Sequence, residues 1–212
     1  LSMGRGRALN FNVAPLNVGM LINQQLFEKK RSVILTSATL RVEGMFDYMR
    51  DRLGASDVDE LAVGSPFDYP AVALLYVLSD IPEPGTQGYQ KAVEETLIEL
   101  FKATEGRALA LFTSYSQLKA TTTAITEPLA KEGITVYSQG SGTSRSQLLE
   151  SFREEDRVVL LGTRSFWEGV DVPGDALSCL VIAKLPFDVP SDPIVSARAE
   201  AYESPFHQYM VP

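Results

Sequence analysis

The feature that most constrains the fold is a series of short apolar runs separated by segments of helical periodicity. Six runs rich in Val, Ile and Leu occupy residues 32–36, 72–78, 107–113, 134–137, 157–163 and 177–185. They are nearly continuous rather than alternating, as in strands covered on both faces. Between them, apolar residues return at helical spacing, as at Val93, Leu97 and Phe101. This alternation predicts an α/β fold with a doubly wound parallel sheet.

Two further helices are indicated by the same periodicity. Apolar residues share one helical face over residues 45–53, and Gly54 follows as a C-terminal cap. A shorter repeat covers residues 148–152. Both segments lie between predicted strands, as the α/β pattern requires.

The composition excludes several kinds of site. The single cysteine, Cys179, lies inside an apolar run, so the chain cannot form a disulfide framework or a cysteine-ligated metal site. The single histidine, His207, argues against His-rich metal chemistry and against a Ser-His-Asp site, and a structural role is the better interpretation of it. We therefore expect no metal site within this chain.

The net charge of −8 sets limits on the partners of the chain. A molecule of this charge repels nucleic acid as a whole, so any contact with a phosphate backbone would use hydroxyls and backbone amides rather than a basic face. No stretch approaches the roughly 18 consecutive apolar residues of a membrane span. We expect no membrane association and a cytoplasmic location. The sequence begins without an initiator Met and is expected to be excised from a longer chain, so a missing signal peptide carries little weight.

A domain boundary is predicted near residues 62–70, where Gly and Pro interrupt the pattern. The five apolar runs after it are enough for one complete α/β domain, assigned to residues 63–212. Residues 1–62 carry a single run and too little apolar surface for a core of their own, so they are interpreted as part of a neighbouring domain. A strand at 32–36 without its home sheet would expose an edge, and self-association through it is expected as an artefact.

Three predicted strands end in hydroxyl-rich turns, where ligands bind in a doubly wound sheet. The hydroxyl residues are Ser37 and Thr39 after the first run, Thr113 and Ser114 after the third, and Thr163 and Ser165 after the fifth. The loop after the fifth run reads GTRSFWEGVDVPG, residues 162–174, and gathers the only Trp with Glu168, Gly169 and Asp171. This loop is either a structural corner or a site.

A structural interpretation competes at several of these positions. The helix-opening pattern S-x-x-E/Q fits Ser114 with Gln117, Ser144 with Gln147, and Ser165 with Glu168. Each of these serines can be only a cap, and the same pattern explains Glu168. Trp167 is more often a core residue than a ligand-binding one. Capping leaves the following GVDVPG unexplained.

Nucleotide-binding fingerprints are missing. The sequence has no G-x-x-x-x-G-K-[ST] loop and no G-x-G-x-x-G after a strand. The Gly-rich stretch QGSGTSR, residues 139–145, precedes a helix and offers amides to an anion, but a flexible polar turn is the better interpretation. If the protein handles a nucleotide, this chain holds only part of the site.

Three motifs in order resemble those of superfamily 2 helicases, specifically the DinG/XPD-like branch. LTSATL at 35–40 is similar to the third motif of that family, LALFTSYSQL at 109–118 to the fourth, and GTRSFWEGVDVPG to the fifth. Flanking stretches such as KLPFDVPSDPI at 184–194 extend the likeness over almost the whole chain. The resemblance implies a RecA-like motor domain with three layers, αβα.

The resemblance also implies a function and assigns roles. It implies part of an ATP-dependent DNA helicase that couples ATP hydrolysis to translocation on single-stranded DNA and to unwinding. In that scheme Glu168, Gly169 and Asp171 lie toward the nucleotide, Thr113, Ser114, Thr163 and Ser165 toward the DNA, and Ser37 and Thr39 couple the two. ATP with Mg²⁺, single-stranded DNA and the rest of the first motor domain are the implied partners.

The same family places essential parts outside this sequence. Its Walker A and B elements would precede residue 1, and its sixth motif, with the arginines that sense the γ-phosphate, would follow Pro212. Because both motor domains share phosphoryl transfer, no catalytic set is complete here, and the chain alone is expected neither to bind and hydrolyse ATP nor to unwind DNA. Two alternatives stay open: a helicase-like interaction module without activity, and an α/β transferase using Glu168 and Asp171 as its acids.

Overall fold

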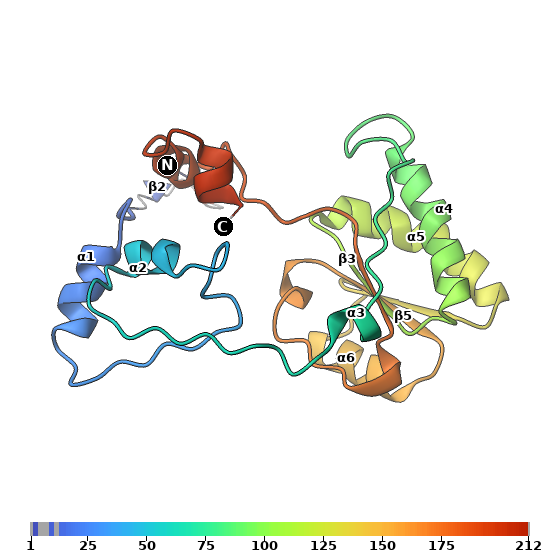
Figure 1. Ribbon diagram of the computed structural model, residues 1–212. Coiled ribbons are helices and arrows are strands. Elements are labelled where there is room, and N and C mark those ends of the chain that lie inside the picture. Colours follow the sequence, from blue (N-terminus) through green and yellow to red (C-terminus); the bar gives the residue numbers. More distant parts are fainter. Residues whose placement is uncertain (1, 4–8, 11–12, 212) are drawn as a thin grey trace. The chain divides into compact units, whose positions relative to one another are not determined.

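A computed structural model describes residues 2–3, 9–10 and 13–211 of the chain (Figure 1). The chain forms two compact units. The first unit comprises Leu1–Ala73 with Phe187–Pro212, and the second comprises Leu74–Pro186. The division into motor domains at residues 1–62 and 63–212 stays a prediction, because units defined by packing need not coincide with domains defined by ancestry.

The second unit is built on a four-stranded parallel sheet. Its strands are β3 (Ala108–Leu111), β4 (Thr135–Ser138), β5 (Val158–Gly162) and β6 (Cys179–Ile182), in the order β4-β5-β3-β6. Three helices connect or flank them, namely α4 (Tyr89–Ala103), α5 (Tyr115–Lys131) and α6 (Arg145–Glu154). The predicted α/β fold is confirmed, and these strands correspond to the last four apolar runs.

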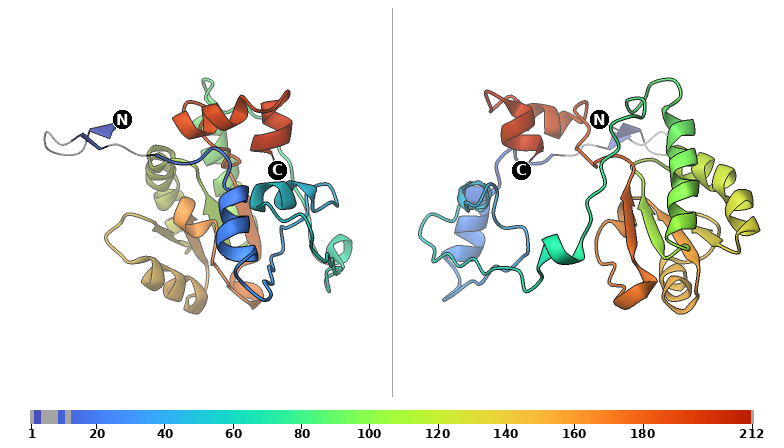
Figure 2. Two further views of the ribbon diagram at one scale, coloured as in Figure 1. Left: turned by 90° about the vertical axis from the view of Figure 1, so that its left-hand side faces the viewer. Right: turned by 45° about the vertical axis from the view of Figure 1, so that its right-hand side comes forward.

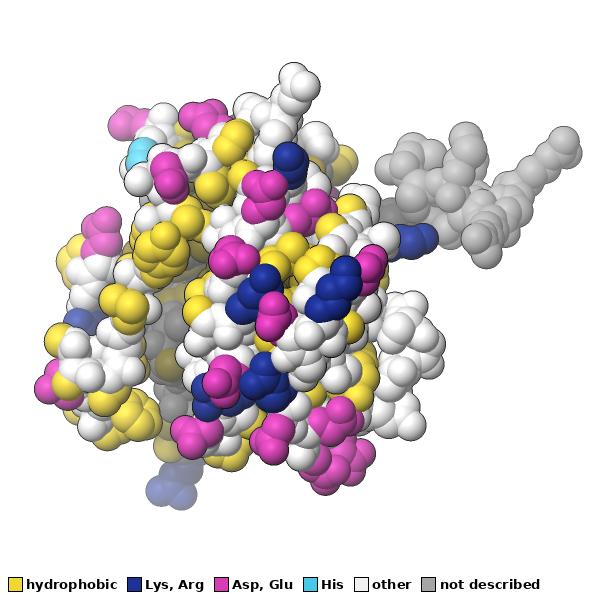
Figure 3. Space-filling model, turned by 90° about the vertical axis from the view of Figure 1, so that its right-hand side faces the viewer, with side chains coloured by type: hydrophobic (Ala, Val, Ile, Leu, Met, Phe, Trp, Pro, Cys, Tyr) yellow, Lys and Arg dark blue, Asp and Glu magenta, His cyan; other side chains and the backbone are white. Residues whose placement is uncertain are grey.

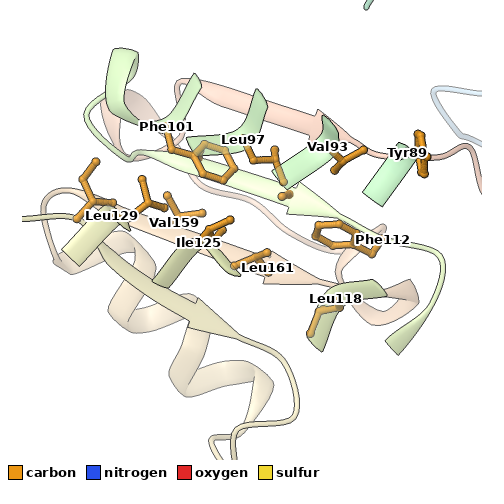
Figure 4. Close-up of a cluster of buried hydrophobic side chains, with 13 residues drawn as sticks. Tyr89, Val93, Leu97, Phe101, Phe112, Leu118, Ile125, Leu129, Val159 and Leu161 are labelled. Carbon is orange, nitrogen blue, oxygen red and sulfur yellow. The ribbon is translucent and has the colours of Figure 1, made fainter. Parts of the chain in front are cut away.

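One face of this sheet packs against α4 and α5. Phe101 is fully buried there, together with Val93 and Leu97 from the same helix face. Figure 4 shows these side chains from α4 meeting Val159 and Leu161 of β5. In the right-hand view of Figure 2, α4 and α5 (green to yellow) lie on the same side of the sheet. The helical spacing in the sequence thus becomes one layer of the core.

The other face packs against α6. Alternate residues of the strands, such as Leu109 and Leu160, point to this side and meet Leu148, Leu149 and Phe152 of α6. Since side chains alternate along a strand, each central strand supplies both cores, which explains its continuous apolar sequence. The second unit therefore has the predicted three layers, αβα.

Two of the three predicted helix caps are present. The Ser114 hydroxyl caps α5 by accepting from the amide of Gln117 at 3.3 Å. Ser144 and Gln147 form a reciprocal capping box at the start of α6. Both bonds satisfy amides that would otherwise lack an intrahelical partner.

The third predicted cap, Ser165 with Glu168, is wrong. Ser165 lies inside a short 3₁₀ helix, η2 (Arg164–Phe166), and its N-cap Thr163 makes no side-chain capping bond. Gly169 follows in the left-handed region at a φ of 64°, which ends any helical path. A second 3₁₀ turn, η3 (Gly174–Ala176), leads into β6.

The first unit contains short elements. Strands β1 (Ser2–Met3) and β2 (Leu9–Asn10) pair antiparallel. The helices are α1 (Gly19–Ile22), α2 (Asp47–Leu53), α3 (Tyr69–Val72) and α7 (Pro193–Ala199), with π-helical turns η1 (Asn23–Phe27) and η4 (Phe206–Met210). Gly54 caps α2 in the left-handed conformation, as predicted, and the helix begins two residues later than its apolar pattern.

The segment that follows the second unit packs on α2 and on the stretch before α1. Arg52 of α2 lies over the ring of Tyr209 at 4.6 Å, and Tyr209 stacks on Tyr202 at 5.7 Å. Arg198 donates to the carbonyls of Leu16 and Pro15 at 2.9 and 3.0 Å. Cation–π contact and charged hydrogen bonds to carbonyls hold this segment in place.

Two of the six predicted strands do not form. Residues 32–36 and 73–78 make no ladder with any strand in the described part of the chain, and Val72 ends helix α3. Ile34 is 89% and Leu74 is 91% exposed. A strand needs a neighbour for its backbone groups, and neither segment has one among the described residues. Self-association through residues 32–36 therefore stays a prediction, and these residues do not form a strand that a second chain could extend.

None of the helices in the described ranges is long and apolar enough to cross a membrane. This agrees with the absence of a long apolar run in the sequence.

Truncation of Phe101 tests the packing of α4 on the sheet. We expect Phe101→Ala to lower the free energy of unfolding by about 3–5 kcal/mol, since it removes a fully buried ring and leaves a cavity. Leu74→Ala, an apolar truncation at an exposed position of the same unit, is the control and should change it by no more than about 0.5 kcal/mol. Chemical denaturation measures both, and equal losses would contradict this packing.

Gly162 offers a second test, at the junction of β5 with the loop that follows. A Cβ at this position would lie 2.6 Å from the ring of Phe166, so the buried ring would have to move. We expect Gly162→Ala to destabilise the protein by about 1–3 kcal/mol, measured by thermal or chemical unfolding. Gly64→Ala is the matched control, because no atom lies within 4 Å of its Cβ. A Gly162→Ala protein as stable as the control would show that this contact is not formed.

Candidate functional site

The carboxyl ends of β3 and β5 meet at the point where the chain changes sides of the sheet. The two strands are parallel neighbours, with Leu111 opposite Gly162. After β3 the chain enters α5, on one face, whereas Phe166 and Trp167 after β5 pack into the core of the other face. Ligands of open α/β sheets bind at such a switch point. The candidate site of the second unit is therefore at the turns beginning with Thr113 and Thr163.

Thr113 and Ser114 lie exposed at the end of β3. Ser114 is the N-cap of α5, and its hydroxyl also lies 3.3 Å from that of Ser116. The start of α5 thus presents backbone amides and neighbouring hydroxyls to solvent. Such an arrangement suits an anion, because the first amides of a helix carry a partial positive charge.

Thr163 is joined to the end of β4 by a polar bridge. Both its amide and its hydroxyl donate to Oε1 of Gln139 at 2.8 Å. The Gln139 side-chain amide donates in turn to the hydroxyl of Tyr115 at 2.6 Å. Thr163 is only 6% exposed, so its hydroxyl is used internally and holds the turn. Neither Gln139 nor Tyr115 was assigned a role from the sequence, although Gln139 begins the Gly-rich stretch at 139–145.

The loop that follows β5 is fixed from α6 by two arginines. Arg145 donates to the carbonyls of Ser165, Glu168 and Gly169 at 2.9, 3.0 and 2.9 Å. Arg153 donates twice to the carbonyl of Asp171, at 3.1 and 2.6 Å. Glu168, Gly169 and Asp171 are all exposed, as is Ser165. The structure thus brings the residues predicted on the nucleotide side into one ordered, solvent-facing loop.

The remaining predicted residues belong to the first unit. The hydroxyls of Ser37 and Thr39 lie 3.1 Å apart, and the amide of Thr39 donates to the Ser37 hydroxyl at 3.1 Å. Both residues are exposed. This is a local turn of the kind that serine and threonine form with their own backbone.

In the described part of the chain, neither the cysteine nor a cluster of metal-binding side chains forms a second candidate site. Burial raises the pKa of the Cys179 thiol, which lies in β6, so little of it is the reactive thiolate. Within residues 2–3, 9–10 and 13–211, no group of three or more His, Cys, Asp or Glu side chains is arranged to hold a metal ion. Trp167 packs against the α6 side of the sheet, as the structural interpretation predicted.

The charge on the face of the second unit shown in Figure 3 is mixed. Lys and Arg side chains are interspersed with Asp and Glu there, without a continuous basic patch. Pairs such as Lys91 with Glu95 on α4 account for part of this pattern. The face shown in Figure 3 therefore offers no broad basic surface to a phosphate backbone, in keeping with the net charge of −8.

Comparison with known proteins supports the resemblance seen in the motifs. Residues 97–212 match the family model described as Helicase C-terminal domain. The chain is 38% identical over 213 aligned residues to the ATP-dependent DNA helicase YoaA of Haemophilus influenzae, covering 99% of this chain and 33% of that protein. It is 42% identical to the ATP-dependent helicase DinG of Mycobacterium tuberculosis, covering 89% of this chain and 28% of that protein. It is 36% identical to the 3′-5′ exonuclease DinG of Bacillus subtilis, covering 93% and 22%.

The chain spans about a third or less of the length of these relatives. The family model covers more than half of the chain, from α4 to the end, and includes every strand of the parallel sheet. The predicted likeness to DinG-type helicases is confirmed, and the chain belongs to the helicase C-terminal domain family.

Proposed function

We propose that this chain is part of an ATP-dependent DNA helicase of the DinG type, which couples ATP hydrolysis to movement along single-stranded DNA. The observation that carries the proposal is the loop at 162–174: it follows β5 at the switch point of the sheet and is held in one shape by α6. The relatives named as ATP-dependent helicases support it.

The nucleotide side of the proposal rests on Glu168, Gly169 and Asp171. A carboxylate accepts hydrogen bonds from ribose hydroxyls, and Asp171 has its backbone carbonyl fixed while the residue as a whole is exposed. Gly169, at a φ of 64°, has no side chain, so a nucleotide can approach its backbone closely. These features fit contact with the ribose of a nucleotide. ATP would supply the phosphoryl group, with its Mg²⁺ and phosphates held mainly by the first motor domain.

The DNA side rests on hydroxyls at the ends of β3 and β5. Thr113, Ser114 and Ser165 are exposed and lie at turns whose donors suit a phosphate backbone. Thr163 contributes through its bonds to Gln139, which hold the turn that carries Ser165. Ser37 and Thr39 are proposed to couple the nucleotide and the DNA.

The proposal treats residues 1–62 as part of the first motor domain and residues 63–212 as the second. Since phosphoryl transfer needs groups from both domains, the chain alone should neither turn over ATP nor unwind DNA. The cytoplasm, where DNA and ATP meet in bacteria, is the proposed location.

The test is ATP hydrolysis by the full-length protein, with and without single-stranded DNA. We expect DNA to stimulate turnover, and Asp171→Ala to lower kcat/KM about tenfold or more, because a hydrogen bond to a charged group is worth about 1.5–3 kcal/mol. Asp156→Ala is the control, since Asp156 is an exposed carboxylate beyond the opposite end of β5.

Three results would count against the proposal. A full-length protein without ATP turnover would favour an inactive helicase-like module. Turnover by the isolated chain would favour a self-sufficient enzyme such as a transferase. Turnover that ignores both DNA and Asp171 would show that the loop at 162–174 is only a structural corner.

A further inference from the structure

We infer that Arg145 and Arg153 are positioning residues, which set the shape of the loop at 164–171 and thereby the nucleotide contacts of the motor. The link from loop shape to nucleotide contact rests on the proposed function. The control of loop shape by α6 does not, because it follows from the hydrogen bonds of the second unit.

The loop has little backbone structure of its own. Its backbone-to-backbone hydrogen bonds are those of η2, from the amides of Phe166 and Trp167 to Thr163 and Arg164. Residues 168–173 make none within the described part of the chain. Peptide groups without such partners are satisfied by side chains or water, and here the side chains come from α6.

Arg145 occupies the centre of this arrangement. One guanidinium reaches three carbonyls, those of Ser165, Glu168 and Gly169, and also lies 5.5 Å from the centre of the Phe166 ring. Its donors point in a fixed planar fork, so satisfying three acceptors defines their positions relative to one another. Phe166 is 1% exposed, so the Arg145 guanidinium packs against a ring that belongs to the core.

Arg153 fixes the far end of the loop. It lies eight residues after Arg145 on α6 and directs both Nε and Nη2 at the carbonyl of Asp171. Neither arginine lies within salt-bridge distance of a carboxylate among the described side chains. The two guanidinium groups thus donate to four backbone carbonyls, three at the residues proposed for the nucleotide, Glu168, Gly169 and Asp171, and one at Ser165.

Gly169 is the residue of the loop that depends most on its backbone conformation. A Cβ at Gly169 would lie 3.6 Å from Nη2 of Arg145, in ordinary van der Waals contact. The need for glycine comes from its left-handed φ, and its carbonyl accepts a hydrogen bond from Nη2 of Arg145 at 2.9 Å. Helix α6 begins at a full capping box, so Arg145, its first residue, has a well-defined backbone.

Arg145→Ala and Arg145→Lys test the inference in the full-length protein. Arg157→Ala is the matched control, because Nη2 of Arg157 also donates to a backbone carbonyl, that of Glu132, at 2.7 Å, but at the amino end of β5. The first readout is acrylamide quenching of Trp167, the only Trp of residues 1–212, in a full-length protein in which any Trp outside these residues is replaced by Phe. The second is the KM for ATP and the kcat of DNA-stimulated hydrolysis, with the thermal midpoint measured alongside.

We expect Arg145→Ala to increase the quenching of Trp167 and to raise the KM for ATP about tenfold or more, since small misplacements of binding groups have effects of this size. Its thermal midpoint should fall no further than that of Arg157→Ala. Arg145→Lys should recover only part of both effects, because one ammonium cannot span three carbonyls. Arg153→Ala, which frees the single carbonyl of Asp171, should show a smaller rise in KM.

The two readouts separate the possible failures. Quenching of Trp167 that is the same in Arg145→Ala and Arg157→Ala would overturn the inference, whatever the activity. If quenching changes as expected but the unmodified protein lacks DNA-stimulated turnover, the loop-shaping role stands and the proposed function fails. Changed quenching with unchanged KM would overturn the link from loop shape to nucleotide contact.

Discussion

The parallel pairing of β3 with β5 determines the position of the candidate site in the second unit. Their register sets Leu111 opposite Gly162, so the turns that begin at Thr113 and Thr163 leave the sheet side by side. The pairing also places the chain on opposite faces immediately afterwards, with α5 on one side and Phe166 in the core of the other. Polar groups at the end of such strands are free to face a ligand because the apolar runs behind them are fully buried.

The loop after β5 needs support from outside itself. It contains a 3₁₀ turn, a glycine in the left-handed region and Pro173, none of which builds a continuous hydrogen-bonded element. Its carbonyls are satisfied by Arg145 and Arg153, while Gln139 holds the turn at Thr163. A loop held by long side chains can change shape if its supporting helix shifts, and a change of this kind would suit the proposed motor.

Much of the fold of the second unit could be predicted from local pattern. Continuous apolar runs identified four strands, and helical spacing identified the buried side of α4, including Phe101. Caps at Ser114 and Ser144 were readable because a capping box is a contact between residues three apart. The runs at 32–36 and 72–78 gave the same signal but form no ladder, since a strand depends on a neighbour that the run does not encode.

The residues of the candidate site could be predicted from the sequence, but the side chains that hold its loop in place could not. Glu168, Gly169 and Asp171 stood out because no strand or cap explains the whole of GVDVPG. Arg145 did not, because its contacts lie 20 to 24 residues away and depend on how α6 packs on the sheet. For the same reason Ser165 was misread as a cap.

Photocrosslinking with an ATP analogue shows whether the loop at 162–174 contacts ATP. The full-length protein is irradiated with an azido-ATP analogue, digested with trypsin and mapped by mass spectrometry. Cleavage after Arg164 and Lys184 releases residues 165–184 as a single peptide, which contains the three residues proposed for the nucleotide, Glu168, Gly169 and Asp171. We expect a label on this peptide that excess ATP suppresses. A label confined to other peptides, with this one recovered unmodified, would contradict it.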